Sequence, residues 1–136
     1  IRKRIYENLK NIGFELPFIV HPKAIVADGV EVGEGTFVAA GAVINSEAKI
    51  GKNTIVNTRS SIDHDCIIGD FVHIAPGVTL SGKITVGDET HIGTGSNVIQ
   101  GIKIGKGCII GAGRTIRNDK TDKFRDVDKR DGYAKE

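Results

Sequence analysis

The sequence predicts an all-β fold, a parallel β-helix in which the backbone winds into a three-sided column. The first observation is a strict period of six, because every sixth residue from Val26 to Ile116 is aliphatic. The second is that the residue two positions before each aliphatic is usually small or apolar, and residues i and i−2 of a strand share one face. Each unit of six therefore supplies two inward side chains and one turn. A helix of period about 3.6 or an ordinary hairpin does not produce this pattern.

A column of glycines indicates how many units close one coil. These glycines each follow an aliphatic residue and are spaced eighteen residues apart: Gly33, Gly51, Gly69, Gly87 and Gly105. Three units therefore make one coil, and we expect the glycines to stack at one corner, where the missing Cβ lets the chain bend. About five coils, stacked about 4.8 Å apart as neighbouring strands are, form a prism that its own side chains fill.

The two ends of the chain differ from the periodic region. Segment 1–12 places four apolar residues on one helical face, before the helix stop at Gly13: Ile1, Ile5, Leu9 and Ile12. We expect this helix to cap the open end of the prism, because repeat arrays need a covered end. Residues 1–22 are thus a capping helix and an extended lead-in, and residues 23–118 are the β-helix. Thirteen of the twenty residues from Arg117 to Glu136 are charged, which predicts a partly disordered or helical charged tail over 119–136.

Composition excludes several classes of partner. The formal net charge of +2 over 136 residues is too small to indicate nucleic-acid binding. No apolar run is long enough to span a membrane, and no signal peptide is visible, so we expect a cytoplasmic protein without a membrane partner. Cys66 and Cys108 occupy inward positions forty-two residues apart, which predicts two buried thiols and neither a disulfide nor a cysteine-based metal site.

The segment with the most chemical potential is 57–77, NTRSSIDHDCIIGDFVHIAPG. His64 falls two residues after Ile62, at a corner, so its imidazole should project outward. Asp63 and Asp65 flank it, and a neighbouring carboxylate favours the charged imidazole and fixes its tautomer. A general base has these requirements. Spacing alone favours the other interpretation, an exposed histidine among solvated acids.

The repeated pattern [Ile/Val/Leu]-Gly-x-x-x-x over residues 21–116, together with the His-Asp-Cys-Ile-Ile-Gly segment, resembles the left-handed β-helix acyltransferases. The nearest groups are the bacterial nucleotide-sugar N-acetyltransferases and the related sialic-acid O-acetyltransferase-like proteins. The left hand comes from this resemblance, since no periodicity reveals it and parallel crossovers are normally right-handed. The resemblance implies direct transfer of an acetyl group from acetyl-CoA to the amine of a nucleotide-linked amino sugar, with no covalent enzyme intermediate and no metal.

The resemblance also implies roles for individual residues. His64 would be the general base and Asp65 the carboxylate that orients it, with Asp63 the less favoured partner. His73 matches a histidine near the acetyl carbonyl, where a donor could stabilise the oxyanion, and Asn57 is assigned to acceptor binding. The other cofactor-binding candidates are glycines that allow close approach and basic residues that could meet phosphates: Gly82, Gly93, Gly95, Gly111, Gly113, Lys103, Lys106, Arg114 and Arg117. As corner glycines and solvated basic residues, they also have a purely structural explanation.

Members of the resembling family are trimers that bind CoA in grooves between parallel prisms, so we expect a homotrimer. Their N-terminal βαβ domain, which holds the nucleotide-sugar, is absent from residues 1–136, and this puts recognition of the acceptor by residues 1–136 in question.

Three alternatives remain open. The same site could acetylate a sugar hydroxyl, or the prism could be a non-catalytic scaffold that has no need for a corner imidazole. The third is a γ-carbonic-anhydrase-like metalloprotein, with His64, His73 and His91 as candidate zinc ligands. The spacing of these histidines does not reproduce that family's pattern. The His64-Asp65 pair fits a base better than a ligand, although metal-bound histidines often have carboxylate partners too.

Overall fold

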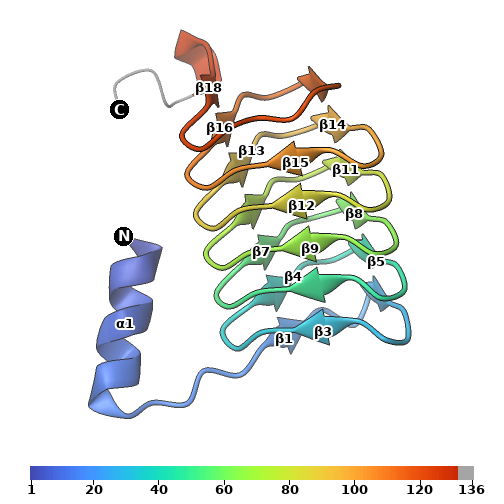
Figure 1. The fold of residues 1–136 in the computed structure, drawn as a ribbon. Helices are drawn as coiled ribbons and strands as arrows, with labels where there is room; N and C mark the ends of the chain where they lie inside the picture. The colour runs from blue at the N-terminus through green and yellow to red at the C-terminus, as the bar shows by residue number, and fades with distance from the viewer. Residues whose placement is uncertain (132–136) are drawn as a thin grey trace.

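The computed structural model describes residues 1–131, which form one helix followed by a left-handed parallel β-helix of about six coils (Figure 1). This confirms the predicted fold class, with slightly more coils than the expected five. Every strand is two residues long, and each of the first five coils contributes one strand to each of three parallel sheets.

Three sheets, here called A, B and C, are the walls of the prism. Sheet A contains β1 (Ile19–Val20), β4 (Phe37–Val38), β7 (Ile55–Val56), β10 (His73–Ile74), β13 (His91–Ile92), β16 (Ile109–Ile110) and β18 (Arg125–Asp126). Sheet B contains β2 (Ile25–Val26), β5 (Val43–Ile44), β8 (Ser61–Ile62), β11 (Thr79–Leu80), β14 (Asn97–Val98) and β17 (Thr115–Ile116). Sheet C contains β3 (Glu31–Val32), β6 (Lys49–Ile50), β9 (Ile67–Ile68), β12 (Thr85–Val86) and β15 (Lys103–Ile104).

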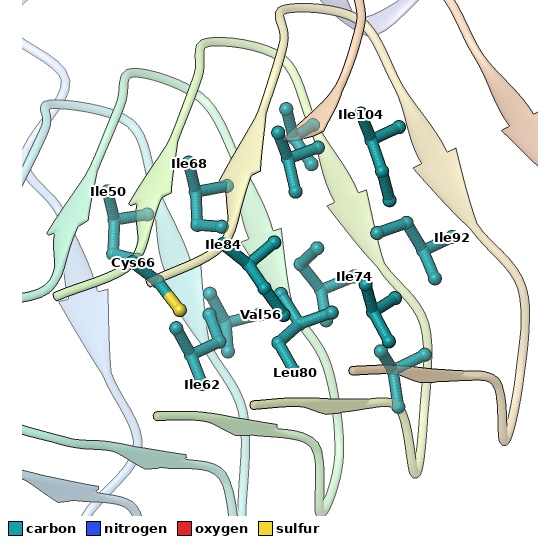
Figure 2. Close-up of a cluster of buried hydrophobic side chains, with 14 of the residues drawn as sticks. Ile50, Val56, Ile62, Cys66, Ile68, Ile74, Leu80, Ile84, Ile92 and Ile104 are labelled. Atoms are coloured by element: carbon teal, nitrogen blue, oxygen red, sulfur yellow. The ribbon is translucent and has the colours of Figure 1, made fainter. Parts of the chain in front are cut away.

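The predicted aliphatic series forms the core (Figure 2). Its members from Val38 to Ile116 are all buried, none more than 4% exposed, whereas Val26 in the first coil remains 36% exposed at the open end. Inward polar residues satisfy their own hydrogen bonds. The Thr54 hydroxyl donates to the Gly69 carbonyl at 2.9 Å and accepts from the Val72 N–H at 3.2 Å. Cys66 and Cys108 are buried free thiols, as predicted.

The glycine column lies at the C–A corner, which joins sheet C to sheet A in each coil. A Cβ on Gly51 would lie 2.5 Å from the Gly69 carbonyl oxygen, and one on Gly87 would lie 2.6 Å from the carbonyl carbon of Gly105. None of the five glycines has a positive φ. The column is therefore required by the close stacking of successive backbones, and the bend that the sequence suggested is not the reason for it.

The helix α1 (Arg2–Ile12) lies along this corner and does not cap the open end of the prism (Figure 1). Gly13 ends the helix in the left-handed conformation, as predicted. The predicted apolar face is not the packed one, because Ile5 and Ile12 remain exposed and Tyr6 is the buried residue. Tyr6 donates a hydrogen bond to Glu34 and packs edge-on against Phe71 at 5.3 Å. Within the described residues, no helix is long and apolar enough to cross a membrane.

The predicted charged tail begins as a further coil. β18 pairs with β16, and Phe124 packs against the core. The sequence analysis missed this coil because it is two residues shorter: Ile109 pairs with Arg125 sixteen residues on, whereas partners in the earlier coils are eighteen apart. A short 3₁₀ helix, η1 (Lys129–Asp131), follows. Residues 132–136 of the predicted tail lie outside the described residues.

Candidate active site

His64 lies at the B–C corner, between the end of β8 and the start of β9. Its neighbour Asp65 has a φ of 59°, the left-handed conformation that Glu47 and Lys83 adopt at the same position one coil away on either side. The Asp63 carboxylate accepts hydrogen bonds from the His64 backbone N–H at 2.8 Å and from Asn45 Nδ2 at 2.9 Å. These two donors lower the pKa of Asp63. Asp63 therefore stabilises the corner through these two hydrogen bonds, and Asp65 is the carboxylate that contacts the imidazole.

The imidazole of His64 pairs with Asp65 on its outer side. Nδ1 lies 2.9 Å from Asp65 Oδ2, and the two side chains are 43% and 50% exposed. Because an ionised carboxylate can only accept, Nδ1 carries the proton. The lone pair on Nε2 of the neutral ring has no hydrogen-bond partner among the described residues. The pair can thus take a proton at Nε2 and hold the resulting imidazolium beside a carboxylate.

Gly82 lies beside the ring of His64, one coil further along. It is buried, and a Cβ added to it would lie 2.5 Å from His64 Nε2 and 2.7 Å from Cε1. The cofactor contact predicted for Gly82 stays a prediction, and the structure adds that its missing side chain leaves room for the imidazole. Their separation of eighteen residues, one full coil, is the signal that could have revealed this neighbour.

A second cluster of imidazoles lies on sheet A. His73 and His91 occupy the same outward position in β10 and β13, and their rings meet edge-on with centroids 4.7 Å apart. Asn57, at the end of β7, lies 3.1 Å from His73 through Nδ2 and Nε2. Burial lowers the pKa of His73, with a further contribution from the positive charge of Arg2. Burial, followed by the charges of His73 and Arg2, lowers the pKa of His91 to about 4.

This cluster borders a pocket of about 310 Å³ at the A–B corner. Its lining residues are His73, Ala75, Pro76, His91, Gly93, Thr94, Ala112 and Arg130. Arg130 was missed by the sequence analysis, since it lies beyond the last residue in register. His64 is at a different corner, so one chain alone does not bring its imidazole to this pocket.

The other predicted cofactor residues lie in several parts of the prism. Gly93, Gly95, Gly111 and Gly113 all lie at the A–B corner, where Gly95 and Gly113 have positive φ and open space around the Cβ position. Of the basic candidates, Arg114 lies at this same corner, and the other three lie elsewhere. Lys103 is on sheet C and Lys106 at the C–A corner, with backbone N–H groups bound to Asp119 and Asp122. Arg114 pairs with Asp126 at 3.1 Å, and Arg117 is exposed after β17.

Two further observations concern possible ligand sites elsewhere in the molecule. Among residues 1–131, no group of three or more histidine, cysteine or acidic side chains is placed to hold a metal ion. A second pocket of about 330 Å³, mostly apolar, lies between α1 and the start of sheet A. It contains none of the predicted site residues.

The depressed pKa of His91 predicts a loss of stability in acid. Above pH 6.5 the residue is neutral in both states. Below pH 6.5, His91 takes up a proton in the unfolded chain, whereas in the folded chain His91 stays neutral down to about pH 4. The free energy of unfolding should therefore fall between pH 6.5 and pH 4, by at most roughly 3 kcal/mol from His91. Urea unfolding of wild type and His91→Gln at several pH values measures this. An equal loss in both would contradict the assignment.

Two family models match adjoining parts of the chain. One is described as bacterial transferase hexapeptide (six repeats) and matches residues 47–82. The other is described as hexapeptide repeat of succinyl-transferase and matches residues 83–117. No curated protein sequence matches the chain.

Solved structures match over almost the whole chain. The acetyltransferase domain of PglB from Neisseria gonorrhoeae is 39% identical with a TM-score of 0.91, and the match covers 93% of this chain and 62% of that one. The same domain has been solved with acetyl coenzyme A. PerB from Caulobacter crescentus, solved with CoA and GDP-perosamine, is 36% identical with a TM-score of 0.90, covering 93% and 61%. The present chain thus spans about three fifths of the length of these proteins.

Proposed function

Because this chain belongs to the hexapeptide-repeat transferases, whose models together match residues 47–117, we propose that it is an acetyl-CoA-dependent N-acetyltransferase acting on a nucleotide-linked amino sugar. The observation that carries the proposal is the His64–Asp65 pair, with its 2.9 Å contact at Nδ1 and a free lone pair at Nε2. The matched structures support the substrate class, since one contains acetyl coenzyme A and another contains CoA with GDP-perosamine.

The geometry supports a single transfer step with His64 as the base. Nε2 takes a proton from the sugar amine as its nitrogen attacks the thioester carbonyl carbon of acetyl-CoA. The C–S bond then breaks, and the imidazolium returns its proton to the departing thiolate. Asp65 keeps Nδ1 protonated throughout and stabilises the imidazolium between the two proton transfers. No atom of the enzyme bonds covalently to the acetyl group.

Residues on the A–B corner would hold the acyl donor. Gly95 and Gly113 lie at the same corner as the pocket beside His73 and His91, and the open space around their Cβ positions would let a narrow pantetheine chain lie against the backbone. Arg130 brings a positive charge to the same pocket, and a guanidinium suits a phosphate. We therefore place CoA along this corner and assign its charged end to Arg130 in preference to Lys103 or Lys106.

A homotrimer would complete this site. The base at the B–C corner and the pocket on sheet A belong to different sides of the prism, so a second prism packed alongside could bring the two together. Exposed apolar side chains on sheet A support such packing, with Ile19 58% and Phe37 40% exposed. We assign the protein to the cytoplasm, where acetyl-CoA is available and buried free thiols such as Cys66 stay reduced.

Acetyl-CoA consumption with a panel of acceptors tests the proposal. The panel contains nucleotide-linked amino sugars, free amino sugars and the matching nucleotide sugars with a hydroxyl in place of the amine. We expect free thiol and a singly acetylated product only with nucleotide-linked amines. Product from the hydroxyl series alone would indicate an O-acetyltransferase. Binding of acetyl-CoA without turnover on any acceptor would favour the scaffold alternative and overturn the proposal.

A further inference from the structure

Asn57 has a fixed amide orientation, because one end of the amide faces an obligatory donor. Its Oδ1 lies 2.8 Å from the backbone N–H of Thr58 and 3.2 Å from the Thr58 hydroxyl. A backbone N–H can only donate, so the atom that faces it must be the carbonyl oxygen of the amide. The NH₂ group of Asn57 consequently points to the other partner, His73.

That orientation determines the proton position on His73. Asn57 Nδ2 lies 3.1 Å from His73 Nε2 and can only donate, so Nε2 must accept and cannot carry a proton. A neutral imidazole then carries its proton on Nδ1. The edge-on contact with His91 at 4.7 Å holds the ring plane in this arrangement. Among residues 1–131, Nδ1 of His73 has no hydrogen-bond partner.

We propose that Asn57 is a positioning residue that holds His73 as its Nδ1–H tautomer, which makes Nδ1–H the single proton that His73 can present to a ligand. This rests on the proposed function for the identity of that ligand, the carbonyl oxygen of an acyl thioester, which gains negative charge as the amine attacks. Acceptor binding, the role that the sequence suggested for Asn57, stays a separate prediction.

The inference separates the two histidines chemically. Both rings carry the proton on Nδ1, but the Nε2 lone pair is free in His64 and occupied in His73. Only His64 can therefore act as a base, whereas His73 can act as a donor. In the proposed reaction, His73 would polarise the thioester carbonyl as a donor. His64 would deprotonate the attacking amine as a base.

Nitrogen-15 NMR of histidine-labelled protein at neutral pH tests the tautomer, with His73 assigned by the loss of its signals in His73→Phe. We expect a protonated Nδ1 and an unprotonated Nε2 in the wild type. Asn57→Asp replaces the donor with a group that only accepts, so the proton should move to Nε2. Thr58→Val keeps the backbone N–H that orients the amide, and it should leave the tautomer unchanged. A wild-type proton on Nε2, or an unaltered tautomer in Asn57→Asp, would overturn the assignment.

Kinetics test the donor role. Asn57→Asp should lower kcat and kcat/KM for acetyl-CoA together, by about 10- to 100-fold, because the lost interaction forms in the transition state. Asn57→Ala, which releases the ring without inverting it, should lose less. An inverted tautomer with unchanged kcat would refute the donor role. If the wild type acetylates no acceptor, the proposed function fails, while the NMR result still decides whether Asn57 fixes His73.

Discussion

Replacing His64 with alanine is expected to lower kcat by about 100- to 10,000-fold, the range that general-base catalysis contributes. Among residues 1–131, the imidazole is the one group at the B–C corner that combines a free lone pair with a carboxylate on its other nitrogen. Its side chain is 43% exposed, so its removal should leave the core and the unfolding midpoint almost unchanged. Thiol release with acetyl-CoA and the best acceptor measures the rate, and urea unfolding checks the fold.

His21→Ala is the matched control. His21 is also a corner histidine, but its Nδ1 accepts a hydrogen bond from the Lys23 backbone N–H, and it has no carboxylate partner within residues 1–131. This variant should retain wild-type turnover. Equal rates in wild type and His64→Ala would remove His64 from the mechanism, and loss in both variants would point to a general effect on the prism.

Gly82→Ala is expected to reduce kcat nearly as much as removal of the imidazole, without unfolding the protein. The new methyl group would need the space that His64 Nε2 now occupies, 2.5 Å from the Cβ position. Because the obstructing atoms belong to the end of a side chain, the ring can rotate away at little cost in stability. The base atom then leaves its position, and a displacement of this size is costly to proton transfer. Rates and unfolding midpoints, measured together, test both parts.

Gly93→Ala provides the contrast. A Cβ there would lie 2.6 Å from the carbonyl carbon of Gly111 and 2.7 Å from the Ala112 nitrogen. Backbone atoms in a stacked coil cannot move aside, so this variant should lose stability. In the double variant Gly82→Ala/His64→Ala, activity should match that of His64→Ala, since both changes act on one imidazole. A further additive loss would show that Gly82 acts independently of His64.

The sequence was most informative about the regular part of the fold. A period of six with eighteen residues to a coil determines which side chains face inward, and the burial of Ile74, Leu80 and Ile92 follows from it. The position of α1 could not be predicted, because an amphipathic pattern does not specify which surface it meets. Its buried residue is Tyr6, which the pattern did not select. The last coil escaped detection because a deletion of two residues destroys a periodic signal.

The candidate site likewise has a part that the sequence could predict and a part that it could not. The pairing of His64 with Asp65 is local, so adjacent residues and a left-handed φ of 59° at Asp65 are enough to form it. The contact between Asn57 and His73 is different. Asn57 lies at the corner after β7, and His73 lies on the face of β10 in the next coil, sixteen residues on. No single periodicity predicts a contact between these two positions. Arg130 has no signal at all, since it follows the shortened coil.

The lengthwise course of α1 has a consequence for how the column comes apart. Arrays in which each repeat touches only its neighbours can lose terminal repeats one at a time. Here one helix contacts four successive coils, at Glu34, Asn53, Phe71 and Glu89. The helix therefore acts as a strut, and fraying from the N-terminal end would have to release all four attachments together. Opening should begin instead at the far end, beyond the reach of the strut, where the final short coil closes the column.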